Sequence, residues 1–144
     1  MKQLDALYRL ARRDHVTVDC FPLPQNASLS LLDEKGNCHI AIDPSMVESS
    51  ADEKVTLAHE LGHCETGAFY NRWSPWDIRQ KHENRVDRWA YRQLLPRRRL
   101  KAAARQGITQ AWELAEYFDL PEAFVRAALD YYRQQEEGKA AGFG

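Results

Sequence analysis

The chain has 144 residues and a formal net charge of −1, and its 44% hydrophobic and 28% charged residues are ordinary for a soluble globular protein. This length fits one domain with a modest hydrophobic core. The near-zero charge gives no bulk electrostatic reason to expect nucleic acid or an anionic membrane as a partner. No apolar run reaches membrane-spanning length and the N-terminal segment is too charged for a signal peptide, so we expect a cytoplasmic protein.

The first 42 residues predict one helix followed by three short strands. Apolar residues recur at helical spacing over about residues 3–13, and the segment HVTVDCFPL then has the β-branched composition of a strand. The segments SLSLL (28–32) and CHIAI (38–42) alternate in polarity around a DEKGN turn, which is typical of a hairpin. We therefore expect an antiparallel sheet of about three strands, with His39 at its surface.

The three cysteines, Cys20, Cys38 and Cys64, show no Cys-x-x-Cys spacing. An odd number of cysteines in a chain expected in the cytoplasm indicates reduced thiols. A disulfide across neighbouring strands between Cys20 and Cys38 is the disfavoured alternative. Cys64 falls on the apolar side of a predicted helix, where a small buried side chain is favoured over a metal ligand.

The segment TLAHELGHCETG contains the pattern H-E-x-x-H within a helix predicted at residues 51–66. His59 and His63 are four residues apart and stand on one helix face, where both imidazoles reach one metal ion. Glu60 is placed to remove a proton from a metal-bound water rather than to bind the ion. These three residues are the first candidates for a metal site.

The ends and faces of this helix can also be read from the sequence. The capping box at Ser50–Glu53 predicts its start, and Gly67 is a suitable stop. The histidines lie opposite an apolar stripe formed by Leu57, Leu61, Cys64 and Ala68. Gly62 costs about 1 kcal/mol relative to alanine within a helix, which indicates that another element packs closely there.

A second helix is predicted at residues 78–95, ending before Pro96. Glu83 and Asp87 lie on its inward stripe, and the opposite face carries Arg85, Arg88 and Arg92. An inward carboxylate needs a strong partner, because burying it bare is very costly. A metal ion meets this need, with Glu83 as third ligand and Asp87, one turn later, orienting a ligand imidazole.

Alternatives remain at this site. His82 is as good a ligand type as Glu83, although it points about 100° away from Glu83 on the helix. His82 or Tyr70 could instead donate a proton near the metal as a catalytic group. Tyr70 belongs to an aromatic loop at 68–81, which either walls a substrate cleft or is pinned to the surface by its rings. Two histidines and a glutamate suit Zn²⁺ best, and manganese or iron could occupy the same ligands.

The tail at 97–137 is predicted to be helical, and residues 138–144 are expected to fray. Two of its helices look superficially like a helix-turn-helix, but the second has a broad packing face and an exposed face of mixed charge. We expect it to pack on the catalytic core. The sequence thus predicts one α+β metallopeptidase domain at 1–137, strand-rich at 16–42, with the sheet packed on the H-E-x-x-H helix.

The segments LAHELGHCETGAFYN and HENRVDRWAYRQLLP resemble the ImmA/IrrE family of small metallopeptidases, the single-domain kind common on phages and integrative elements. The second segment follows the family pattern E-x-x-A-[DN]-x-[FW]-A-x-x-x-L-[LI]-P, except that Val86 stands where alanine is usual. The resemblance covers most of the chain. It implies a minimal, gluzincin-like zincin fold, with His59, His63 and Glu83 as zinc ligands and Glu60 as catalytic base.

The resemblance also implies an anti-repressor that cleaves a helix-turn-helix repressor, often encoded by a neighbouring gene. We therefore expect a zinc endopeptidase with a narrow protein substrate, bound by strand addition to an edge strand around Cys38 to Ile42. One alternative is a binding module that releases the repressor without cleavage and whose zinc is structural. A less favoured alternative is a DNA-binding regulator that uses the C-terminal helices.

Overall fold

The computed structural model describes residues 2–71 and 73–140. The chain forms two compact units, Met1–Leu94 and Leu95–Gly144. Within the described ranges, no helix has both the length and the apolar character needed to cross a membrane. The single metallopeptidase domain expected at 1–137 stays a prediction.

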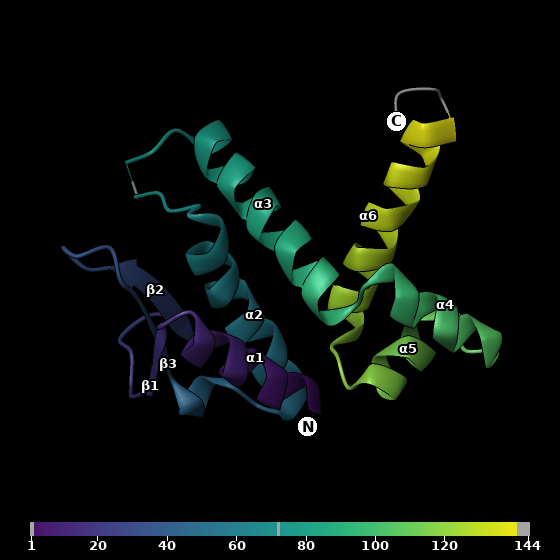
Figure 1. Cartoon of the computed structure of the whole chain (residues 1–144), viewed down its shortest axis with the longest axis horizontal. Helices are drawn as coiled ribbons and strands as arrows, with labels where there is room; N and C mark the ends of the chain where they lie inside the picture. The colour runs from purple at the N-terminus through teal and green to yellow at the C-terminus, as the bar shows by residue number, and fades with distance from the viewer. Residues whose placement is uncertain (1, 72, 141–144) are drawn as a thin grey trace. The chain divides into compact units, whose positions relative to one another are not determined.

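The first unit carries both sequence motifs. Its elements are α1 (Lys2–Arg13), β1 (Thr17–Cys20), β2 (Ser28–Leu32), β3 (Cys38–Ile42), the short 3-10 helix η1 (Pro44–Met46), α2 (Ser50–Thr66) and α3 (Trp76–Leu94) (Figure 1). The opening helix and the two hairpin strands are confirmed at the predicted positions. Both motif helices are present, and α3 begins two residues earlier than the predicted start at residue 78.

The sheet has the order β1-β3-β2 and is mixed rather than antiparallel. β2 pairs antiparallel with β3 as predicted, but β1 pairs parallel with β3, so the expectation of a fully antiparallel sheet was wrong. Burial favours the central position of β3: it is the most apolar strand, with Ile40 and Ile42 almost fully buried, and β1 and β2 cover its two edges. The expected edge strand at Cys38–Ile42 is therefore the central strand, and β2 is an edge.

The helix α2 lies between the sheet and α3, in contact with β2, β3 and α1 as well (Figure 1). Leu57 and Leu61 are completely buried there, which confirms the predicted apolar stripe. A disulfide joins Cys38 of β3 to Cys64 of α2, so the expectation that these two cysteines are reduced was wrong. Cys20 is free and exposed.

The alternative Cys20–Cys38 disulfide is excluded by the strand register. Cys20 pairs with Ile42, at the opposite end of β3 from Cys38. The side chain of Cys38 instead faces α2. The surface position predicted for His39 is confirmed, because its half-exposed ring contacts Thr17 and Asp33, away from the site described below.

The start of α2 differs by one residue from the prediction. Ser49 is the N-cap, and its side chain accepts a hydrogen bond from the main-chain N–H of Asp52 at 3.2 Å. The capping box was expected with Ser50 as the N-cap, so its predicted position is one residue late, and the carboxylate of Glu53 accepts a 2.6 Å hydrogen bond from the Tyr8 hydroxyl. This contact ties α1 to α2.

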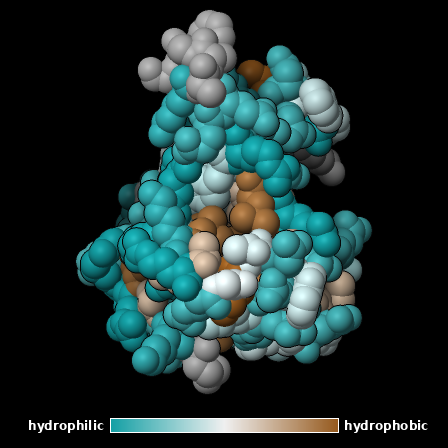
Figure 2. All heavy atoms as spheres, turned by 90° about the vertical axis from the view of Figure 1, so that its right-hand side faces the viewer, coloured by the Kyte–Doolittle hydropathy of each residue, from teal (hydrophilic) through white to brown (hydrophobic). Residues whose placement is uncertain are grey.

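The second unit is helical, as predicted for residues 97–137. It contains α4 (Arg97–Arg105), α5 (Ala111–Phe118) and α6 (Glu122–Ala140). α6 continues through 138–140, which were expected to fray, and residues 141–144 lie outside the described part. The exposed side of α6 pairs its own charges, Arg126 with Glu122 at 3.0 Å and Arg133 with Asp130 at 3.1 Å. Most of the molecular face drawn in Figure 2 is hydrophilic.

Candidate metal centre

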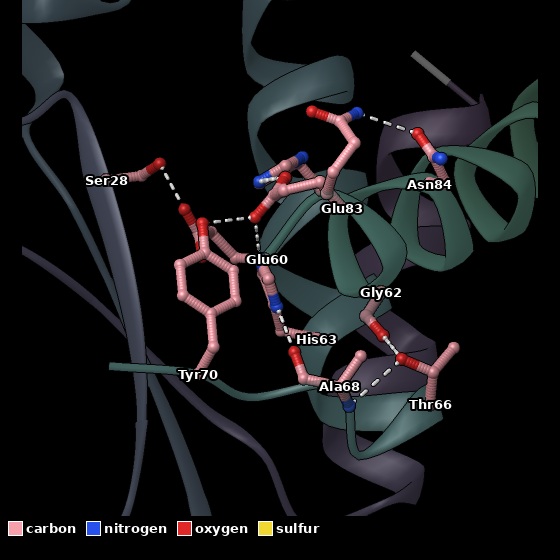
Figure 3. A network of polar contacts seen from close by, with 11 residues as sticks. Ser28, Glu60, Gly62, His63, Thr66, Ala68, Tyr70, Glu83 and Asn84 are labelled. Carbon is pink, nitrogen blue, oxygen red and sulfur yellow. Dashed lines mark hydrogen bonds and ion pairs between the residues drawn. The ribbon is translucent and has the colours of Figure 1, made fainter. Parts of the chain in front are cut away.

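Two imidazoles and one carboxylate meet where α2 faces α3, and Figure 3 shows His63 and Glu83 of this group. The rings of His59 and His63 lie 4.9 Å apart between centroids, as their four-residue spacing requires. The Nε2 atoms of both rings lie 3.4 Å from Glu83, each from a different carboxylate oxygen. The possible ligand atoms of these three residues all lie within 4.8 Å of one another, so the group could hold a metal ion.

Gly62 explains how α3 comes close enough to supply Glu83. A Cβ atom at this position would lie 2.9 Å from Cγ1 of Val86 and 3.3 Å from its main-chain oxygen. Only a residue without a side chain permits this approach of the two helices. The close packing predicted at Gly62 is confirmed, and Val86, the departure from the family pattern, is the residue that packs there.

The orientation of His63 is fixed by the chain that follows α2. Gly67 ends the helix in a left-handed conformation with φ 67°, as predicted. The chain then places the carbonyl oxygen of Ala68 2.6 Å from Nδ1 of His63. Because a carbonyl can only accept, Nδ1 carries the proton and Nε2 presents its lone pair to the site. Sequence reasoning missed this main-chain contact, and Gly67 was its only signal.

Glu60 lies beside the three candidate ligands and is only 6% exposed. Its Oε2 atom accepts a 2.6 Å hydrogen bond from the hydroxyl of Ser28 in β2 (Figure 3). A buried carboxylate needs such a donor. Sequence reasoning did not identify Ser28, because the contact depends on which strand of the sheet lies next to α2.

Tyr70 and His82 have different positions relative to the site. The Tyr70 hydroxyl donates a 2.6 Å hydrogen bond to Oε1 of Glu83 (Figure 3). Partial burial, with the hydrogen bond to Glu83, raises the pKa of Tyr70 to about 12, so the hydroxyl is protonated near neutral pH. The ring of His82 stacks on that of Tyr70, with ring centroids 6.2 Å apart. The catalytic roles predicted for both residues stay predictions.

Asp87 lies one turn after Glu83 on α3 and is half-buried. Burial raises the pKa of Asp87 above its ordinary value, and the charge of His59 acts in the opposite direction. The role predicted for Asp87, orienting a ligand imidazole, stays a prediction.

A cavity of about 470 Å³ lies over the three candidate ligands and Glu60. One wall is the loop after α2, which contributes Phe69 and Tyr70, and the other is the edge strand β2. The remaining lining residues are Asn26, Ser28, Leu29 and Ser30. The sequence left the role of the aromatic loop open. In the structure, Phe69 and Tyr70 of this loop form one wall of the cavity.

The donor set fits a divalent transition metal. Two neutral imidazoles and one carboxylate on three converging positions are the ligand set of catalytic zinc sites, which keep a further position open. Here all three candidate ligands line the cavity. Manganese or iron would accept the same donors.

Comparison with known families agrees with this geometry. A family model described as IrrE N-terminal-like domain, Peptidase_M78, matches residues 13–130. The match takes in the sheet, both motif helices, α4, α5 and part of α6. No curated protein and no solved structure matches the chain.

Proposed function

This chain belongs to the IrrE N-terminal-like peptidase family, and from that membership we propose that it is a zinc-dependent endopeptidase with a narrow protein substrate. The observation that carries the proposal is the meeting of His59, His63 and Glu83, with the buried carboxylate of Glu60 beside them. A structural site would need only the ligands. A carboxylate at the edge of the cavity is what hydrolysis requires in addition.

The chemistry follows from the positions of the side chains. Bound zinc would act as a Lewis acid toward a water molecule and the scissile carbonyl. Glu60 takes the proton from the attacking water and delivers it to the leaving amine. The Tyr70 hydroxyl donates its one proton to Glu83 in the structure, and on turning away from Glu83 it would donate that hydrogen bond to the developing oxyanion. Asp87 holds a ligand imidazole in place from behind.

The substrate is proposed to bind as an extended segment along β2. β2 is an edge strand and lines the cavity with Ser28, Leu29 and Ser30. An edge strand presents unpaired main-chain groups to which a peptide can add as a further strand. The groove is short, so narrow specificity would come from docking of a folded partner.

The proposed substrate is a helix-turn-helix repressor encoded by a neighbouring gene, which would place the activity in the cytoplasm. The family resemblance, rather than the geometry, supports this partner. A non-cleaving binding module with structural zinc remains the second candidate function. The charge pairs along α6 favour neither phosphate binding nor a DNA-binding role.

The test combines zinc binding with cleavage of the neighbouring repressor. Glu60→Gln should keep zinc and fold but lose cleavage, because the amide cannot accept the proton. Glu83→Gln should weaken zinc binding strongly. Asp77→Asn is the matched control, because it neutralises an exposed carboxylate on the same helix.

The outcomes separate the candidate functions. Undiminished cleavage by Glu60→Gln would overturn the proposed mechanism. Release of the repressor by Glu60→Gln without cleavage would instead support the binding module. Zinc affinity unchanged in Glu83→Gln would exclude Glu83 as a ligand.

A further inference from the structure

The pairing of β2 with β3 determines which β2 residues face the free edge. The N–H of Asp43 donates to the carbonyl of Ala27 at 2.8 Å, and the N–H of Asp33 donates to Asn37 at 2.9 Å. In an antiparallel pair, hydrogen-bonded positions alternate with positions whose main-chain groups point away. Positions 27, 29, 31 and 33 therefore bond to β3. The main-chain N–H and C=O of Ser28 and Ser30 point to the free edge.

Ser28 also faces α2 with its side chain. Its hydroxyl donates to Oε2 of Glu60 at 2.6 Å, a length typical of a hydrogen bond to an ionised carboxylate (Figure 3). Ser28 thus fixes the position of one oxygen of the Glu60 carboxylate.

Ser28 therefore contacts Glu60 with its side chain and lies on the free edge of β2 with its main chain. We propose that Ser28 is a positioning residue, whose hydroxyl aligns Glu60 while its main chain pairs with the substrate. This inference rests on the proposed function. Because one residue touches both the base and the docking edge, a peptide that pairs with Ser28 is held in a fixed register relative to Oε1 of Glu60. The substrate's extended backbone, rather than a particular side chain, is what this arrangement recognises.

Ser30 provides the matched control. It lies two positions along β2, shares the side-chain face of Ser28, lines the same cavity and presents its main chain to the same edge. The hydroxyl that donates to Glu60 is that of Ser28. Alanine at either position makes the same chemical change on the same strand.

The kinetic test uses the zinc-loaded protein and the neighbouring repressor. Ser28→Ala should lower kcat by about tenfold to a hundredfold, because the base is no longer aligned, and should change KM by less than about twofold. Ser28→Thr keeps a hydroxyl at this position, and threonine is well accepted in strands. Its kcat should therefore be close to that of the wild type. Equal losses in Ser28→Ala and Ser30→Ala, or no loss in Ser28→Ala, would overturn the assignment.

A second measurement requires no bound zinc, no catalytic turnover and no substrate. In metal-free protein with ¹³C-labelled glutamate, the carboxylate resonance that disappears in Glu60→Gln belongs to Glu60. Ser28→Ala should shift that resonance, whereas Ser30→Ala should not. An unshifted resonance contradicts the role of Ser28. If the wild type binds no zinc or cleaves no repressor, the proposed function fails, and this measurement still decides whether Ser28 holds Glu60.

Discussion

Cys38 of the central strand and Cys64 of α2 are joined by a disulfide, with their Cα atoms 5.8 Å apart. Cys64 directly follows His63, so the bond ties the candidate metal centre to the sheet. Closing a loop with a sequence separation of 26 residues stabilises a fold by about 3–4 kcal/mol. Reduction should therefore lower the free energy of unfolding by that amount, measured by urea unfolding with and without a thiol reductant.

Two variants control this measurement. Cys20→Ala removes the exposed free thiol and should leave the response to reductant unchanged. The double variant Cys38→Ala, Cys64→Ala should lose the response and match the reduced wild type. A wild type whose unfolding midpoint ignores the reductant would contradict the stabilising role.

The residues that the sequence predicts to lie together, and that the structure brings together, depend on local geometry. His59 and His63 follow from one turn of one helix. Glu83 follows from the face that it shares with apolar residues on α3, opposite the arginines. The strands β2 and β3 follow from alternation of polarity around a short turn. None of these inferences needs to know which distant segments meet.

The features that the sequence did not reveal depend on the order of the strands. Placing β3 in the centre makes β1 its parallel neighbour and makes β2 the edge. The same order places β2 beside α2 and brings Ser28 to Glu60. Hydrophobic alternation fixes which face a residue occupies, but not which strand is its neighbour.

Tyr70→Phe tests whether Tyr70, rather than His82, donates a proton or hydrogen bond to the developing oxyanion. The pKa of Tyr70, raised to about 12, keeps its hydroxyl protonated near neutral pH, so it acts as a donor and not as a base. Its removal should lower kcat for repressor cleavage by about tenfold to a hundredfold. Zinc affinity, measured by chelator competition, should stay close to that of the wild type, because the three ligands remain.

His82→Gln is the comparison, because the ring of His82 stacks on that of Tyr70. It should lower kcat less than Tyr70→Phe does. The reverse order of effects would assign the donor role to His82.

The lowered pKa of Asp33 predicts that the stability of the fold depends on pH for a reason unrelated to the candidate metal centre. The hydrogen bond from His39, with main-chain N–H groups of Asn37 and Lys35, lowers the pKa of Asp33 from 3.8 to about 2. A carboxyl with a lowered pKa in the folded state stabilises the fold above its unfolded pKa, and this contribution is lost as the pH falls toward about 2. Asp33→Asn should therefore destabilise the protein at pH 5 and approach the wild type near pH 2.

Urea unfolding across this pH range measures the difference between the two proteins. Glu34→Gln, an exposed carboxyl in the same turn, is the control and should parallel the wild type. A constant difference between Asp33→Asn and the wild type at every pH would show that the contribution of Asp33 is not ionic.

Gly62→Ala tests the close approach of α2 and α3. Alanine gains about 1 kcal/mol of helix propensity, but its Cβ would lie 2.9 Å from Cγ1 of the buried Val86. Overpacking of this kind costs about 1–3 kcal/mol and should prevail, because the branched Val86 side chain and its main chain cannot move aside easily. Gly138→Ala is the control, since a Cβ there has nothing within 4 Å, and it should not lower stability.

A double-mutant cycle with Val86→Ala identifies the cause of the loss. Val86→Ala alone should destabilise the fold by leaving a cavity beside Gly62. In the double variant the methyl group introduced by Gly62→Ala would occupy part of that cavity, so the combined loss in unfolding free energy should be smaller than the sum by about 1 kcal/mol or more. Additive losses in urea unfolding would show that Val86 does not set the helix separation. The distance between α2 and α3, and with it the reach of Glu83 to His59, would then depend on another contact.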